Sequence, residues 1–135
     1  MIMMNKYMML IKWIDKLTMY YDIDNNTYNL FIYILHKFIE KKPFIFIENI
    51  ACIGFCCLSL AFKYNEGYDN DELSFRFILK RVLRKHAFTL EEFKHFEFFV
   101  FKTIEFHIPL EYDDIMNYIH TSDVLFKHDK SISSS

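Results

Sequence analysis

The stretch that most constrains the fold is IACIGFCCLSLAFK, from Ile50 to Lys63, which is apolar on every side of a helix. Its one hydroxyl group belongs to Ser59, and its one charge belongs to Lys63 at the very end. A helix that is hydrophobic all round is either the centre of a helical core or a membrane span. Small residues within it, such as Gly54, would let neighbouring helices approach closely. We therefore expect this helix at the buried centre of an all-helical domain.

A membrane span is the minor alternative. The apolar run from Phe44 to Phe62 approaches the length of a transmembrane helix, but Glu48 and Asn49 interrupt it. The uninterrupted part is shorter than the roughly 20 apolar residues that cross a bilayer. At the N-terminus, Lys6 and Lys12 break the apolar run MIMMNKYMMLIKWI, which argues against a signal peptide. We expect no membrane partner.

The composition favours one domain built of long helices. The chain has 135 residues, and 53% of them are hydrophobic, as in a globular protein. Only two glycines and two prolines occur, too few for the many turns of a β fold. The net charge is −2 and neither half is strongly basic, so nothing predicts nucleic-acid binding.

Apolar residues recur at helical spacing along the rest of the chain and predict helices on both sides of the central one. Thr89 opens TLEE, a capping-box pattern at the start of a helix. Pro43 and Pro109 interrupt the chain between helices. The expected helices cover residues 5–21, 27–41, a central helix from near 48, 71–86 and 89–106, with a short C-terminal helix at 112–121. We expect one all-α domain over residues 1–108, and a short helical extension with a frayed tail over 109–135.

Residue types that often carry chemistry show no catalytic or metal-binding pattern. Cys52, Cys56 and Cys57 form an odd set on the apolar central helix, typical of small core residues in a reducing compartment. No glycine-rich phosphate loop occurs, and the six histidines are scattered without metal-ligand spacing. Asp113 and Asp114 are adjacent and would face different directions on a helix. We expect no catalytic residue, no metal and no cofactor, and hence not an enzyme.

Three stretches resemble the cyclin family, and mitotic cyclins in particular. IKWIDKLTMYYDIDNNTYNLFIYILHKFIEK resembles the first two helices of the cyclin box. IGFCCLSLAFKYNE resembles the family pattern VGxxxLLxASKxEE, and FTLEEFKHFEFFVFKTIEFHIP resembles YTxxEILxMExxILxxLxFDLxxP. The matching residues are Trp13, Tyr21, Thr27, Phe38, Gly54, Ala61, Lys63, Glu66, Thr89, Glu97, Phe106 and Pro109. Because their order and spacing agree over residues 10–109, the chain resembles a single cyclin box of five helices.

The resemblance implies a regulatory subunit that binds, and activates, a cyclin-dependent kinase in the cell cycle, in the cytoplasm or nucleus. In cyclins, the Lys of the ASK motif and the Glu of the ME motif bind the backbone around the kinase αC helix. Lys63 and Glu97 occupy these positions here. The family positions that pack on the same kinase helix are Leu60, Phe101, Phe106 and Ile108. Without the resemblance, Lys63 would be interpreted as a helix-end cation, Glu97 as a solvated residue and Leu60 as internal core.

Two departures from the family pattern have physical consequences. The Arg and Asp that pair beneath the surface in cyclins are Tyr7 and His36 here, so both charges are lost together and neither is left unpaired. In the patch that recruits RxL-bearing substrates, Lys6, Lys16 and Ala51 replace the family's Met, Glu and Gln. A cation at residue 16 would repel the basic residue of the RxL motif, so we expect no docking of such substrates.

The extent of the chain leaves a second hypothesis open. Only 27 residues follow Ile108, so we expect no second cyclin box. Single-box cyclins exist, but a lone box could also occupy a kinase without activating it. The alternative hypothesis is therefore a non-activating interaction module of cyclin fold, such as a viral or parasite decoy that binds a host kinase or another factor.

Overall fold

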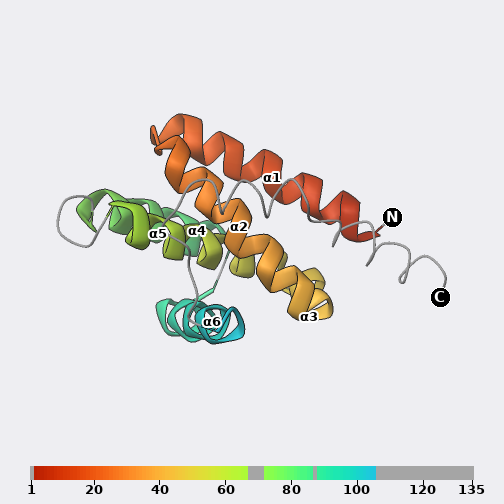
Figure 1. The fold of residues 1–135 in the computed structure, drawn as a ribbon. Helices are drawn as coiled ribbons and strands as arrows, with labels where there is room; N and C mark the ends of the chain where they lie inside the picture. The colour runs from red at the N-terminus through yellow and green to blue at the C-terminus, as the bar shows by residue number, and fades with distance from the viewer. Residues whose placement is uncertain (1, 67–71, 87, 106–135) are drawn as a thin grey trace.

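The computed structural model describes residues 2–66, 72–86 and 88–105, and these residues form an all-α domain. Its helices pack as one bundle in which α1 and α6 lie on opposite sides of α4 (Figure 1). The helices are α1 (Ile2–Tyr20), α2 (Asn25–Lys41), α3 (Pro43–Glu48), α4 (Ile50–Glu66), α5 (Glu72–His86) and α6 (Leu90–Thr103). The predicted all-α class is confirmed. The predicted helix at 112–121 lies outside the described residues.

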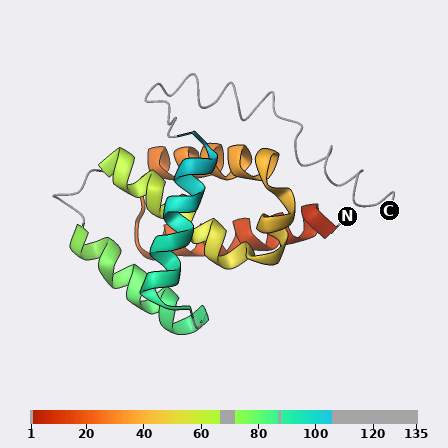
Figure 2. The same ribbon diagram turned by 90° about the horizontal axis from the view of Figure 1, so that it is seen from below.

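Helix α4 is the centre of the bundle, as its sequence predicts. Every residue from 53 to 62 is buried, and α4 packs against each of the other five described helices. Helix α6 crosses the bundle at a steep angle to α2 and α4 (Figure 2). Burial on all sides explains why this helix has no polar face, because each side meets apolar side chains of a neighbour.

Gly54 permits the close approach of α1 to α4. A Cβ atom at residue 54 would overlap the side chain of Leu10, which is itself buried. The position therefore requires the smallest residue, because a larger one would push α1 away from the core. This contact confirms the prediction that small residues of the central helix admit a neighbour.

Side chains cap the starts of two helices, and the cap at Thr89 is the one that the TLEE pattern predicts. The Asp24 carboxylate accepts a hydrogen bond of 2.7 Å from the Asn26 amide at the start of α2. The Thr89 hydroxyl accepts one of 3.1 Å from the Glu92 amide at the start of α6. Each cap satisfies an amide that has no partner within its helix.

The short helix α3 was not predicted. Pro43 ends α2, as expected, but it also occupies the first turn of α3, where its missing N–H has no cost. The central helix consequently begins at Ile50 rather than near Glu48. Asn49 separates α3 from α4 and donates a side-chain hydrogen bond of 3.1 Å to the Ile45 carbonyl.

The break at Asn49 divides the apolar run that raised the membrane alternative. Its first part lies in α3 and its second in α4, with a cap between them. Among the described residues, no helix has both the length and the apolar character that a membrane crossing requires.

Candidate functional site

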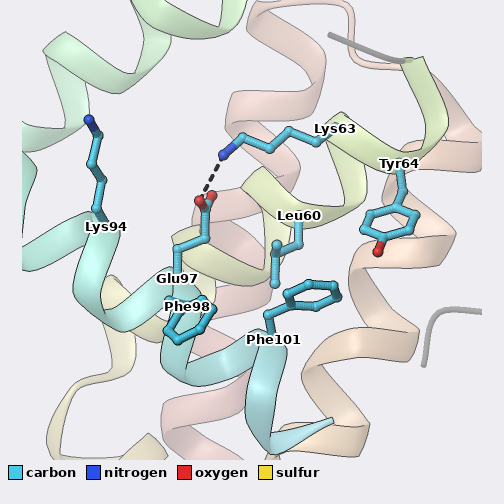
Figure 3. A pocket seen from close by; sticks show the side chains of 7 residues that line it. All are labelled: Leu60, Lys63, Tyr64, Lys94, Glu97, Phe98 and Phe101. Carbon is cyan, nitrogen blue, oxygen red and sulfur yellow. Dashed lines mark hydrogen bonds and ion pairs between the residues drawn. The ribbon is translucent and has the colours of Figure 1, made fainter. Parts of the chain in front are cut away.

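The candidate site contains an ion pair that joins α4 to α6. Lys63, in the last turn of α4, places its Nζ atom 2.7 Å from Oε1 of Glu97, in the middle of α6 (Figure 3). The Lys63 side chain remains 30% exposed and the Glu97 side chain 14% exposed. The packing of α6 on α4 thus brings together two residues that are 34 positions apart in the sequence.

Ser59 completes this pair from inside the core. Its hydroxyl, fully buried, donates a hydrogen bond to Oε2 of Glu97. One carboxylate oxygen of Glu97 therefore faces a buried hydroxyl and the other a partly exposed ammonium group. Such a carboxylate is held in a fixed position and is not a freely solvated one. Ser59 was not predicted as a residue of the site, although it lies one helical turn before Lys63 and thus on the same face.

The ion pair borders a groove of about 360 Å³ between α4 and α6. Its wall is largely apolar, and its aromatic rings pack across the two helices, with the Tyr64 and Phe101 centroids 6.1 Å apart. Figure 3 shows these side chains on one side of the two helices. The lining residues are Leu60, Lys63, Tyr64, Lys94, Glu97, Phe98 and Phe101. An apolar groove with a few fixed polar groups is suited to binding a protein segment.

Four of the six residues predicted to bind a kinase line this one groove: Leu60, Lys63, Glu97 and Phe101. Leu60 is only 6% exposed, so it contributes to the core as well as to the groove. The other two, Phe106 and Ile108, lie outside the described residues.

Three lining residues were not predicted. Tyr64 lies one turn after Leu60 on α4, and Phe98 lies one turn after Lys94 on α6. The i,i+4 spacing could have placed them beside the predicted residues. It could not have shown which face of α6 remains open, because that depends on how α6 packs.

A second polar link joins α1 to α2. The Tyr7 hydroxyl and Nε2 of His36 are 3.0 Å apart and share a hydrogen bond. His36 is 6% exposed, and burial lowers its pKa to about 4. Burial also raises the pKa of Tyr7 to about 12. Both groups are therefore neutral near pH 7, and the expectation that these positions leave no unpaired charge is confirmed.

The cysteines belong to the core. Cys56 and Cys57 are fully buried and Cys52 is half-buried, all three as free thiols. Burial raises the pKa of Cys56 and of Cys57, which keeps both protonated. No set of three or more His, Cys, Asp or Glu side chains is placed to hold a metal ion in the part of the chain that the structure describes.

The family model Cyclin, N-terminal domain, matches residues 3–109. This match covers the whole bundle described above, including both helices that form the groove. No curated protein sequence and no solved structure matches the chain.

The all-helical box with a central buried helix is thus a cyclin box, and the chain belongs to the cyclin family. Membership implies a cyclin-like regulatory role, because cyclins regulate other proteins rather than catalyse reactions. Protein kinases are the partners typical of the family, and a role in the cell cycle is typical of its members.

Proposed function

We propose that this chain is a regulatory subunit that binds and activates a cyclin-dependent kinase through the groove between α4 and α6. The observation that carries the proposal is the Lys63–Glu97 pair, which borders the groove at the two positions that cyclins use to hold the kinase αC helix. A cyclin partner of this kind acts in the cytoplasm or nucleus, where we expect this chain.

The geometry of the pair supports this use. The ammonium group of Lys63 has three N–H donors, so it can bind a backbone carbonyl of a partner while it retains Glu97. Glu97 is positioned by Ser59 and Lys63 before any partner arrives, which reduces the entropy lost on binding. The apolar wall formed by Leu60 and Phe101 would receive side chains of the same kinase helix.

Activation requires more than occupancy of the groove. An active kinase holds its αC helix inward, where an αC glutamate pairs with the catalytic lysine. A regulatory subunit shifts the kinase to that arrangement only if it binds the inward state more tightly than the outward state. Binding of both states with equal affinity would give a module that occupies the kinase without activating it. That outcome is the alternative function.

A binding experiment with two isosteric variants tests the proposal. The kinase is recovered from cell lysate with the wild-type chain, identified by mass spectrometry, and titrated by calorimetry. Lys63→Met removes the ammonium but keeps the apolar stem, and Glu97→Gln keeps an acceptor for Ser59. We expect each to weaken kinase binding by about 2–5 kcal/mol, because the partner's backbone group is left buried and unpaired.

The double variant gives a sharper result. Lys63 and Glu97 contact each other, so their combined loss should be clearly smaller than the sum of the single losses. Lys12→Met, on the exposed side of α1, is the matched control and should bind as wild type does. If both groove variants are folded by circular dichroism and bind with wild-type affinity, the proposal is wrong. Phosphorylation assays of the complex then separate activation from mere binding.

The same preparation tests the expectation about RxL substrates. Lys6 donates a hydrogen bond of 3.1 Å to the Ile47 carbonyl at the end of α3, and Lys16 is exposed on α1. We expect no saturable binding of a labelled RxL peptide in a fluorescence titration, because Lys16 repels its basic residue. Saturable binding that Lys16→Glu leaves unchanged would show that the family alignment of α1 is wrong.

A further inference from the structure

The charges that line the groove are not balanced. Glu97 is engaged by both Lys63 and Ser59, whereas Lys94 is exposed and forms no ion pair or hydrogen bond with another described residue. Figure 3 shows the Lys94 side chain extending from α6 apart from the Lys63–Glu97 pair. Within the described part of the groove, Lys94 is therefore a cation without a matching anion.

An exposed aromatic residue lies one helical turn from this cation. Phe98 is 57% exposed and lines the same groove. The Nζ atom of Lys102, one further turn along α6, lies 5.2 Å from the centroid of the Phe98 ring. Leu90, one turn before Lys94, is 44% exposed.

These four residues form a surface that we call the α6 stripe: Leu90, Lys94, Phe98 and Lys102. Apolar and basic side chains alternate along it at four-residue spacing, which places all four on one side of the helix. Glu91 and Glu92 lie in the first turn of α6, so anions near that end of the stripe would be repelled. The stripe therefore favours carboxylates beside Lys94 and Lys102 rather than beside Leu90.

We propose that the α6 stripe extends the groove into a docking surface for an acidic amphipathic helix. Apolar side chains of that helix would cover Phe98, and its carboxylates would pair with Lys94 and Lys102. Four residues rise about 6 Å in any α-helix, so a helix aligned with α6 can place side chains at four-residue intervals beside those of the stripe. That this helix belongs to the bound kinase rests on the proposed function, and Lys94 is then a residue that determines which kinase is selected.

Two synthetic peptides test the surface without a kinase. Each peptide is a helix of about 18 residues in which a leucine lies midway between two charged residues that are eight positions apart. The two charged residues are glutamates in one peptide and lysines in the other. We expect the glutamate peptide to shift the backbone amide signals of the α6 stripe in the ¹⁵N-labelled chain. It should bind at least about tenfold more tightly than the lysine peptide, and added salt should reduce that difference.

Charge reversal provides the decisive variant. Lys94→Glu should abolish the preference for the glutamate peptide, whereas Lys12→Glu on α1, a reversal of the same charge at an exposed site, should leave it unchanged. Equal binding of the two peptides, or no binding of either, overturns the proposed surface.

Titration of the captured kinase separates this inference from the proposed function. We expect Lys94→Glu to lower kinase affinity at least about tenfold while Lys63 and Glu97 remain intact. If the kinase binds wild type and Lys94→Glu equally, the kinase is not the occupant of the stripe, although the proposed function stands. If the glutamate peptide binds as expected but no kinase does, the proposed function fails and the acidic-helix surface remains.

Discussion

Two of the polar links between helices of this domain differ in charge and in burial. Lys63 and Glu97 join α4 to α6 as an ion pair beside an open groove, with 30% and 14% of their side chains exposed. Tyr7 and His36 join α1 to α2 as a neutral hydrogen bond, and His36 is 6% exposed.

The difference follows from the cost of removing charge from water. A buried ion pair loses in desolvation much of what it gains in attraction, and a charge left without its partner is strongly destabilising. The α1–α2 contact pairs the Tyr7 hydroxyl with Nε2 of His36 without charges, so we infer that it serves the fold. The α4–α6 pair retains its charges where a partner can reach them, in agreement with a role in binding.

Of the changes that test the two links, a decrease in pH should have the largest effect on the stability of the folded chain. His36 has a pKa near 4 when folded, against an ordinary value of 6.5. The unfolded chain therefore binds more protons at this site between these values, so stability is complete above pH 6.5 and falls as the pH decreases towards 4. We expect a loss of up to about 3 kcal/mol in the free energy of unfolding, measured by urea titration at pH 7 and pH 4.

His36→Gln is the control for this loss, because it keeps a hydrogen-bonding group for Tyr7 but does not titrate. Carboxylates elsewhere in the chain contribute equally to both proteins, so the difference between their pH profiles isolates the histidine. Parallel profiles for wild type and His36→Gln would contradict the neutral, buried state of His36.

Removal of the Tyr7 hydroxyl should have the next largest effect. Tyr7→Phe leaves Nε2 of His36 buried without its partner, and we expect unfolding to become easier by about 1–3 kcal/mol in urea at pH 7. The double variant Tyr7→Phe with His36→Leu removes both polar groups and should recover part of that loss. If the double variant recovers none of the stability lost in Tyr7→Phe, the two residues do not act as a pair.

The ion pair should contribute least to the stability of the free chain. Lys63→Met should change the free energy of unfolding by no more than about 1 kcal/mol, because the ammonium group is partly exposed and screened by solvent and Glu97 keeps its hydrogen bond from Ser59. The same variant is expected to weaken kinase binding, so stability and binding should separate at this position. A stability loss as large as that of Tyr7→Phe would remove the distinction between the two links.

Several features could be predicted because they depend on local sequence or on complete burial. The stretch from Ile50 to Lys63 is apolar on all sides, and only a central position buries all sides of a helix. Thr89 caps α6 through a contact with an amide only three residues away. The resemblance to cyclins singled out Lys63 and Glu97, and the structure joins these two residues as an ion pair.

Other features were decided by the tertiary structure alone. Pro43 is compatible both with the end of one helix and with the first turn of the next, so the sequence did not distinguish an interruption from α3. The hydroxyl of Ser59 donates its hydrogen bond to Glu97 on another helix, 38 residues away in the sequence. Along α6, Phe93 and Phe98 are the same residue type, yet one is buried and the other is 57% exposed. Periodicity identifies residues that share a face, but only the packing of α6 on α4 determines which face meets the core and which remains open to a partner.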